Sequence, residues 1–258
     1  MLHKATRTKA IVDQGPFVVH VNMPGRNLPG HDDYGYAALV AVADSHMAPG
    51  TLVGMHRHVQ DEIVSWVPHG VMRHDDRAAG KLIADADHLM VMNSGRGFWH
   101  EERTLATDPP LRMLQIFVRP RAVNLEPGIQ HGSLEAPTAN AWRHLVGPEG
   151  GDAPFFVRNE VHLFDIALEA GASARLPVLA GWSVYFYVYS GLVESEGQTF
   201  GEGESGLAVE AEALTLVAGA PSSLVAFLID PHAKITREGN VGDGGTRALD
   251  ARLRRNDR

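Results

Sequence analysis

Glycine and proline interrupt this chain so often that long helices are disfavoured and many short strands are expected. The 258 residues include 27 Gly and 15 Pro, which fall roughly every ten residues between short runs rich in valine, leucine, isoleucine and aromatic residues. Helical periodicity is nearly absent. We therefore predict an all-β fold, a sandwich or a barrel. Strands are expected in these runs: 17–21, 38–42, 62–67, 111–118, 161–168, 184–189 and 224–229.

Length and composition divide the chain into two β units. A chain of 258 residues can form one large domain or two of about 100–150 residues. The run 119–150 is polar and rich in proline and glycine, so it is interpreted as a connection. The flanking halves resemble each other weakly, since 62–67 is followed by Gly70 and 185–189 by Gly191. The predicted parts are an N-terminal barrel over 1–120, a connection over 121–150, a C-terminal barrel over 151–236 and a tail over 237–258.

Acidic residues outnumber basic ones. The chain has 31 Asp and Glu against 23 Lys and Arg, a formal charge of -8. Direct nucleic-acid binding is not expected, because phosphate contacts need clustered lysine and arginine. The tail is locally basic and is interpreted as a solvated charge run. Two alternative predictions are made for the tail: it forms a short helix around 247–254, or it is mobile.

The sequence shows no recognisable targeting or membrane segment. The basic N-terminus is not followed by the apolar run of roughly 7–15 residues that a signal peptide needs. No stretch approaches the ~18 apolar residues of a membrane span. The expected location is therefore cytoplasmic, and the absence of cysteine agrees with it.

The chain contains no cysteine but 14 histidines. Without cysteine it cannot form disulfides, thiolate zinc sites, iron–sulfur clusters or a cysteine nucleophile. A bound metal would therefore need histidine, aspartate and glutamate ligands. Half of the histidines lie in one stretch, 46–100, which is where such a site is expected.

Two segments of this stretch carry the candidate ligands. Residues two apart on a strand share a face, so a strand through His56, His58 and Glu62 would aim all three side chains one way. Some forty residues later, a Gly-x-Gly turn precedes His100 and Glu102, which also share a face, while the neighbouring Glu101 points away. Three imidazoles and a carboxylate suit Fe(II), Mn, Ni, Cu or Zn and leave coordination positions open.

These segments resemble those of a known family. Gly50, His56-x-His58 and Glu62 look like the first cupin motif, and the segment 92–102 closely resembles the second motif of the pirin-like bicupins, which belong to the cupin superfamily. The resemblance covers most of 15–232 and is strongest over 34–118. It implies two stacked jelly-roll-like β-barrels, with one metal in the N-terminal barrel.

Carried over by position, the resemblance implies that the metal ligands are His56, His58, His100 and Glu102. Glu62 is the alternative carboxylate, because the glutamate of the first motif is the ligand in ordinary cupins. Otherwise Glu62 would orient a metal-bound imidazole through its second N–H. Two departures stand out, since the family usually has proline where this chain has Arg57, and a small residue where it has Glu101. They leave the substrate undetermined.

Other features were assigned by their positions along the strands. Trp66 and Met92 share the parity of the ligands and are the candidates for an apolar substrate pocket. His69, His74 and His88 lie near predicted turns and are expected to be exposed, and His46 to be structural. In the C-terminal barrel, His162 and His232 have no partner at a usable spacing, so that barrel is expected to lack a metal site and to be structural.

The resemblance favours an enzyme, since some pirin-like proteins cleave flavonols such as quercetin with O2. The expected activity is a quercetinase-like, metal-dependent dioxygenase, an oxidoreductase most simply loaded with Fe(II), acting on a small aromatic substrate and O2. Glu102, or Glu62 in its place, would take the substrate's hydroxyl proton as general base.

Two other functions stay open. One is a metal- and redox-responsive transcriptional co-regulator like pirin itself, which would act through a protein partner. The charge of -8 argues against direct DNA binding but not against protein contact. The other is a bicupin enzyme with a different small-molecule substrate and reaction.

Overall fold

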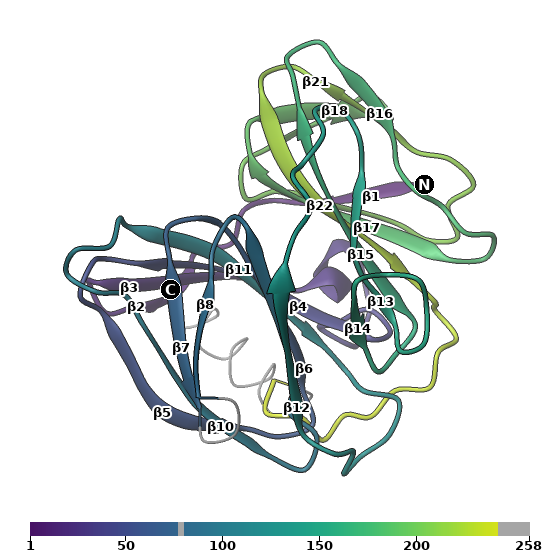
Figure 1. The fold of residues 1–258 in the computed structure, drawn as a ribbon. Helices are drawn as coiled ribbons and strands as arrows, with labels where there is room; N and C mark the ends of the chain where they lie inside the picture. The colour runs from purple at the N-terminus through teal and green to yellow at the C-terminus, as the bar shows by residue number, and fades with distance from the viewer. Residues whose placement is uncertain (77–79, 242–258) are drawn as a thin grey trace. The chain divides into compact units, whose positions relative to one another are not determined.

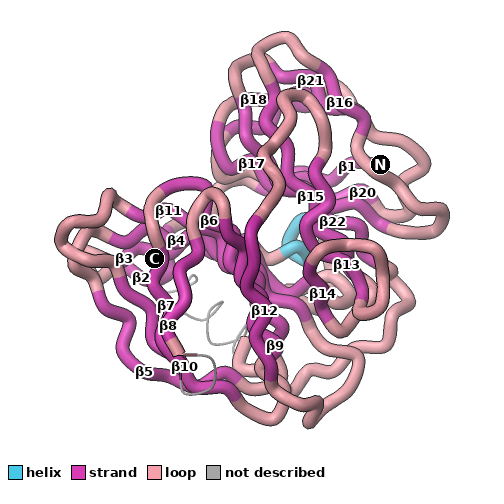
Figure 2. The backbone as a smooth tube through the Cα atoms, viewed as in Figure 1, coloured by secondary structure: helices cyan, strands magenta, loops and turns pink. Residues whose placement is uncertain are grey.

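A computed structural model of the chain describes residues 1–76 and 80–241 (Figure 1). The described residues form strands and one short 3-10 helix, η1 (Pro24–Asn27), which is visible as the helical segment of Figure 2. The predicted all-β class is therefore confirmed. No helix in the described ranges is long and apolar enough to span a membrane. The part of the predicted tail beyond residue 241, including 247–254, lies outside the described residues.

The chain divides into two compact units, and each is built from several segments. The first barrel comprises Lys9–Asn22, Val40–Glu135 and the segment that starts at Lys234. The second barrel comprises Met1–Thr8, Met23–Leu39 and Ala136–Ala233.

The first barrel consists of a seven-stranded and a four-stranded sheet. The larger sheet has the order β12 (Gly128–Ser133), β9 (His88–Asn93), β6 (Glu62–His69), β11 (Leu111–Val118), β4 (Leu39–Met47), β3 (Phe17–Asn22) and β2 (Ala10–Asp13). The smaller sheet has the order β5 (Leu52–His58), β10 (Phe98–Arg103), β7 (Met72–Asp76) and β8 (Lys81–Ala84).

The second barrel is built from the same two kinds of sheet. Its seven-stranded sheet has the order β1 (Leu2–Ala5), β20 (Ser205–Ala208), β17 (Ser183–Ser190), β22 (Ser222–Ile229), β15 (Val161–Leu168), β13 (Arg143–Pro148) and β14 (Phe155–Val157). Its four-stranded sheet has the order β16 (Ser173–Arg175), β21 (Thr215–Ala218), β18 (Leu192–Ser195) and β19 (Gln198–Gly201).

The strand orders of the two barrels correspond, which agrees with the weak internal duplication of the sequence. One edge differs, since β14 pairs parallel with β13 whereas β2 pairs antiparallel with β3. In chain order, β6 leads through Gly70 to β7 of the smaller sheet, and β17 leads through Gly191 to β18. Both glycines have positive φ, 87° and 90°. Each larger sheet also receives one edge strand from a distant segment, β12 beside β9 and β1 beside β20.

This long-range pairing corrects the predicted domain boundaries. β1 and η1 belong to the second barrel although they precede the first in sequence. The predicted connection over 121–150 contains β12 of the first barrel and all of β13 of the second. The beginning of the predicted tail returns to the first barrel, where Asn240 N–H donates to the Val59 carbonyl over 3.1 Å. Local composition does not reveal such pairings, because they join residues far apart in the chain.

An apolar cluster shows which face of each strand points into the first barrel. It joins residues from both sheets: Met47, Val67, Met72, Ala84, Met90, Leu111 and Met113. Because side chains alternate along a strand, Ile63, Ser65 and Val67 of β6 face the interior, whereas Glu62, Val64 and Trp66 face the other way. On β9, Met90 and Met92 face the interior.

The turn after β6 leaves no room for a side chain at Gly70. A Cβ on Gly70 would lie 2.6 Å from Leu111 Cα and 2.7 Å from Pro110 O. Gly15 has a similar φ, 75°, but no atom within 4 Å of the corresponding position. We expect Gly70→Ala to lower the free energy of unfolding by about 2–4 kcal/mol, from strain and the clash together. The control Gly15→Ala should cost only about 1–2 kcal/mol. Equal losses in chemical denaturation would contradict this account of the turn.

Candidate metal centre

Three of the predicted ligands meet on two neighbouring strands of the smaller sheet. β5 and β10 pair antiparallel, with His56 opposite His100 and His58 opposite Phe98. The His56 and His100 rings are 4.3 Å apart between centroids, and His58 is 5.0 Å from His56 and 5.2 Å from His100. Suitable nitrogens of the three side chains all lie within 4.8 Å of one another.

The candidate carboxylate lies on the same face of β10 as His100, because the two residues are two apart on the strand. The register shifts between His100 and Glu102, so that Glu102 pairs with Val53 rather than with the residue expected from a regular ladder. The extra residue of this bulge lies on β5, since β10 keeps a regular register with β7. On its other side, Glu102 pairs with His74 of β7. Glu102 is 3% exposed and accepts a hydrogen bond from Gln115 Nε2 over 2.7 Å at Oε1.

The hydrogen bonds of the histidines leave one kind of nitrogen for a metal. His56 Nδ1 donates to the Gly54 carbonyl over 2.9 Å, and His58 Nδ1 lies 3.4 Å from Asp61 Oδ2. His100 Nδ1 lies 3.2 Å from His74 Nδ1. Each Nδ1 therefore has a partner, and His100 Nε2 is buried without a hydrogen-bond partner among the described residues. A buried nitrogen of this kind fits a metal ligand, because an orphaned polar atom is otherwise unfavourable.

Burial favours the neutral form of His56, His74 and His100, which is the form of imidazole that binds metals. Burial is the main cause that lowers the pKa of His56 and of His74. Burial and the neighbouring histidines together lower the pKa of His100 to about 2. Burial acts in the opposite sense on the carboxyl group and raises the pKa of Glu102 to about 7.

Glu62 lies on the opposite side of the larger sheet. The strand that starts at His56 does not continue to Glu62 as expected, because the chain turns at Gln60, with φ of 57°, and Glu62 begins β6. There it accepts a hydrogen bond from Asn93 Nδ2 over 2.5 Å. Both residues lie on the face that points away from the interior cluster. No candidate ligand group among the described residues contains Glu62.

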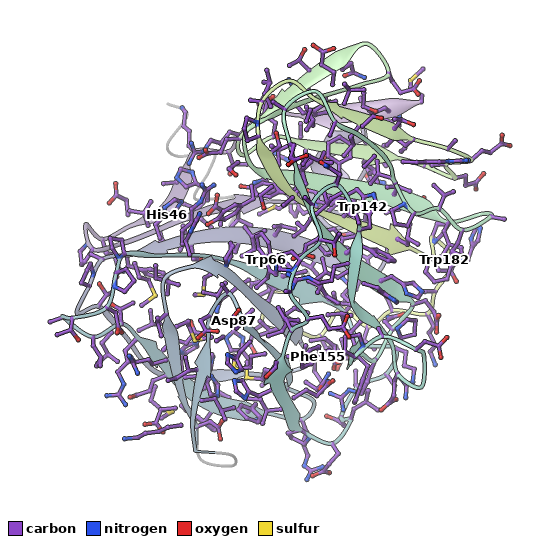
Figure 3. All side chains as sticks on the ribbon, turned by 45° about the horizontal axis from the view of Figure 1, so that its top comes forward. His46, Trp66, Asp87, Trp142, Phe155 and Trp182 are labelled. Atoms are coloured by element: carbon purple, nitrogen blue, oxygen red, sulfur yellow. The ribbon has the colours of Figure 1, made fainter. Side chains whose placement is uncertain are left out.

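The two predicted pocket residues also separate. Met92 faces the barrel interior on β9, whereas Trp66, labelled in Figure 3, lies on the outward face of β6. Whether a residue number is odd or even shows which residues of one strand share a face, but it does not relate that face to the face of another strand. The expectation that Trp66 and the ligands point the same way is therefore wrong. Met92 stays a prediction as a pocket residue, whereas Trp66 does not face the interior in which the histidines lie.

His74 is the residue that sequence reasoning missed. It was expected to be exposed, but it is 1% exposed on β7 and forms a second candidate ligand group with His100 and Glu102. Its Nε2 donates to Asp76 Oδ2 over 2.7 Å. The available signal was the His-x-Asp spacing, which puts both side chains on one face of a strand. His69 is exposed as expected, and the side chain of His88 is 37% exposed.

The family departures lie on the outer face of the smaller sheet. Arg57 is exposed and donates from Nη2 to the Arg96 carbonyl over 2.7 Å. Glu101 forms its ion pair with Arg103, at 3.3 Å, on its own strand. Neither side chain faces the histidines.

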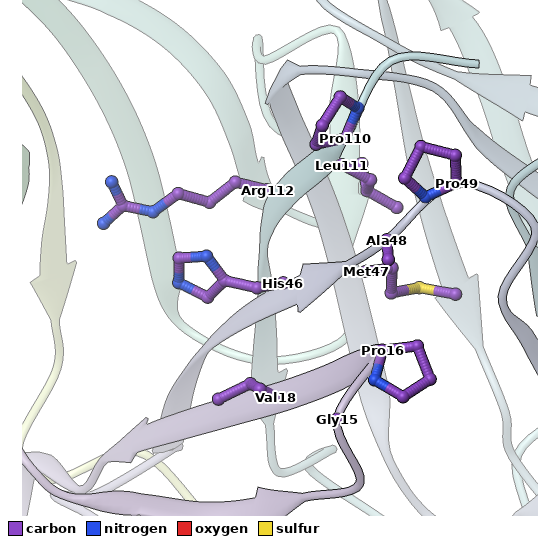
Figure 4. A pocket seen from close by; sticks show the side chains of 10 residues that line it. All are labelled: Gly15, Pro16, Val18, His46, Met47, Ala48, Pro49, Pro110, Leu111 and Arg112. Atoms are coloured by element: carbon purple, nitrogen blue, oxygen red, sulfur yellow. The ribbon is translucent and has the colours of Figure 1, made fainter. Parts of the chain in front are cut away.

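A separate pocket of about 270 Å³ lies at the ends of β3, β4 and β11 (Figure 4). Its lining is mostly apolar, with Pro16, Pro49 and Pro110, and it includes His46 and Arg112. The Arg112 guanidinium pairs with Asp44 at 2.7 Å. None of the candidate metal ligands lines this pocket.

The second barrel carries apolar side chains where the first carries ligands. The strands that correspond to β5 and β10 are β16 and β21, and they contribute Ala174, Leu216 and Ala218 to an apolar core. Both candidate ligand groups found in the described residues lie in the first barrel. His162, however, does have a partner, since its Nδ1 lies 3.0 Å from His144 Nε2.

Comparison with known proteins agrees with this architecture. Residues 14–118 match the sequence model of the Pirin family. Quercetin 2,3-dioxygenase of Escherichia coli strain K12 is 24% identical over 198 residues, which cover 76% of this chain and 84% of the relative.

Two solved structures share the fold. The structure of bacterial pirin YhhW from Escherichia coli in complex with nickel(II) has a TM-score of 0.76 and 20% identity, and covers 89% of this chain and 99% of that one. A quercetin 2,3-dioxygenase from Acinetobacter baumannii has a TM-score of 0.75 and 16% identity, covering 97% of this chain and 89% of that one.

Two barrels of equivalent topology, with a candidate N/O ligand set in the first, define a bicupin. The match over residues 14–118 confirms the resemblance stated for the sequence. The chain has the bicupin fold, and its residues 14–118 resemble the Pirin family.

The raised pKa of Glu102 predicts how stability depends on pH in the metal-free protein. Between its ordinary value of 4.5 and about 7, the folded protein holds a proton that the unfolded chain has lost. Folding stability from this group therefore falls as pH rises through that window. The Glu102→Gln variant lacks this term, so its free energy of unfolding should rise relative to wild type by on the order of 3 kcal/mol across the window.

Chemical denaturation of both metal-free proteins between pH 4.5 and pH 8 measures this difference. Glu101→Gln, on the outer face of the same strand, is the matched control. A constant difference between Glu102→Gln and wild type at all pH values would contradict the assignment.

Proposed function

We propose that this protein is a mononuclear-metal dioxygenase that acts on flavonol-type small molecules. The observation that carries the proposal is the convergence of three imidazoles, each with Nδ1 engaged elsewhere. The buried carboxyl group of Glu102 belongs to a second candidate group, which shares His100. The relatives support the reaction class, since one from Escherichia coli is named quercetin 2,3-dioxygenase.

The proposed ligands are Nε2 of His56, His58 and His100 and a carboxylate oxygen of Glu102. Fe(II) is the proposed metal, because three imidazoles, one carboxylate and open positions suit it. The same ligand set accepts Mn, Ni, Cu or Zn, and the nickel(II) complex of bacterial pirin YhhW supports including nickel in any test. When bound, the ion supplies Lewis acidity toward the hydroxyl and keto oxygens of a flavonol and redox capacity for reaction with O2.

Glu102 is the proposed general base. In the metal-free protein, burial raises the pKa of its carboxyl group to about 7, and a bound cation would lower that pKa and favour the carboxylate form that accepts a proton. Gln115 holds Oε1 through a hydrogen bond of 2.7 Å, which orients the group. Glu62 is not proposed in this role, because it lies on the other face of the larger sheet.

The apolar interior would exclude water and receive an aromatic ring. Met90 and Met113 belong to the cluster inside the barrel, and Phe117 has its ring centroid 6.2 Å from that of His58. Met92 faces the same interior, so we propose it as a contact for the substrate ring. Thioether and aromatic side chains adapt well to flat apolar ligands.

Metal loading and turnover test the proposal together. We expect about one equivalent of metal to bind, and the Fe(II) form to consume O2 while flavonol absorbance disappears. His56→Ala should abolish metal binding, because it removes one of three nitrogens, whereas the exposed His69→Ala should bind normally. If metal bound stoichiometrically but none of the Fe, Mn, Ni and Cu forms turned over a flavonol, the proposed flavonol activity would be overturned. Full occupancy in His56→Ala would overturn the ligand assignment.

A pair of conservative variants separates the two glutamates. Glu102→Gln should lower metal affinity roughly 10–100-fold or more, because it removes an anionic ligand. Glu62→Gln changes a side chain on the opposite face and should leave affinity within about twofold. Isothermal titration of both variants with the same metal measures the contrast, and the reverse order would make Glu62 the ligand.

A further inference from the structure

A chain of hydrogen-bonded side chains leads from Asp76 to the candidate ligand His100. His74 and Asp76 lie two residues apart on β7, on the face that Met72 of the interior cluster occupies. His74 Nε2 and Asp76 Oδ2 are 2.7 Å apart, and His74 Nδ1 and His100 Nδ1 are 3.2 Å apart. The exposed fractions are 1% for His74, 6% for Asp76 and 1% for His100, so water does not substitute for these contacts.

The direction of each hydrogen bond follows from the chemistry of the groups. A carboxylate oxygen only accepts, so His74 must donate to Asp76 from Nε2. A neutral imidazole carries one proton, which leaves His74 Nδ1 as an acceptor. His100 must then donate from Nδ1, and its own Nε2 carries a lone pair. That Nε2 is the buried atom without a hydrogen-bond partner.

Backbone contacts hold Asp76 in the orientation that this chain requires. The Gly80 N–H donates to Asp76 Oδ1 over 3.3 Å, and the Asp76 N–H donates to the Gly80 carbonyl over 3.0 Å. One carboxylate oxygen is therefore engaged by the backbone, and the other faces His74.

We propose that Asp76 and His74 are positioning residues that hold His100 in the tautomer whose Nε2 can bind the metal. The inference rests on the proposed metal centre. The tautomer itself is a property of the metal-free chain, so it can be measured whether or not a metal binds. Partners of this kind fix ring orientation and ligand basicity in metal sites.

Replacement of Asp76 by asparagine should reverse the hydrogen bonds. Because the Gly80 N–H needs an acceptor, the amide oxygen of Asp76→Asn would stay beside it, and the amide nitrogen would face His74 Nε2 and donate to it. His74 would then carry its proton on Nδ1 and donate to His100 Nδ1. The proton of His100 would move to Nε2, the metal-binding atom. We expect metal affinity to fall roughly 10–100-fold.

Asp75→Asn is the matched control. Asp75 lies on the same strand but on the outer face, where it pairs with Arg103 at 3.0 Å and Lys81 at 3.8 Å. It has the same chemistry as Asp76 without access to the histidines. Its affinity for metal should stay within about twofold of the wild-type value.

Two-bond proton–nitrogen spectra of the metal-free proteins report the tautomers directly. Wild type should show the proton of His74 on Nε2 and that of His100 on Nδ1, and Asp76→Asn should show both reversed. A wild-type His100 protonated on Nε2 would overturn the proposal. The proposal would also be overturned if the Asp76→Asn variant kept the wild-type tautomers and bound metal as tightly as the Asp75→Asn variant.

A second variant separates positioning from simple packing. His74→Phe keeps a flat ring but removes both nitrogens, so it should also weaken metal binding. Asp76→Asn should then cause no further loss in the His74→Phe background, because its effect passes through His74. If the losses of metal affinity from the two substitutions were additive, they would be two independent packing effects, and the proposed positioning of His100 through His74 would be overturned. A wild-type protein with the expected tautomers but no metal affinity would instead overturn the proposed metal centre.

Discussion

The antiparallel pairing of β5 with β10 is the interaction on which the candidate metal centre depends. It sets His56 opposite His100, and Glu102, two residues further along β10, faces the same interior side. A ladder slip of one residue would send these side chains to the exposed face of the sheet, where Arg57 and Trp99 now lie. The larger sheet contributes two contacts to the site: Gln115 donates a hydrogen bond to Glu102, and the Phe117 ring lies beside the His58 ring.

The two barrels show what the same framework does with and without this ligand set. Their sheets have equivalent strand orders, so the backbone places β16 and β21 as it places β5 and β10. Where the first barrel has imidazoles and a carboxyl group, the second has Ala174, Leu216 and Ala218 in a continuous apolar core. Burying neutral apolar groups stabilises a barrel without further conditions. Burying polar ligands requires partners for each nitrogen and oxygen, which Gly54, Asp61, His74 and Gln115 supply in the first barrel.

The sequence predicted the strands well where apolar runs alternate with turn residues. The expected runs at 111–118 and 161–168 coincide with β11 and β15, and the run at 17–21 falls one residue short of β3. It was less informative for polar strands. β7 has the sequence Met-Arg-His-Asp-Asp and follows a glycine turn, so His74 looked like an exposed loop residue. Burial of these polar side chains comes from the opposite sheet, which no local pattern describes.

Three features follow from the amino-acid sequence alone, because they depend on local periodicity and on motif spacing: the all-β class, the duplication and the approach of His56, His58 and His100. Other features become visible in the folded barrels: the side of the sheet on which Glu62 and Trp66 lie, the partners of each imidazole, and the membership of β1 and β12 in their barrels. Those features depend on strand register and on pairing between distant segments, which the three-dimensional packing of the whole barrel selects.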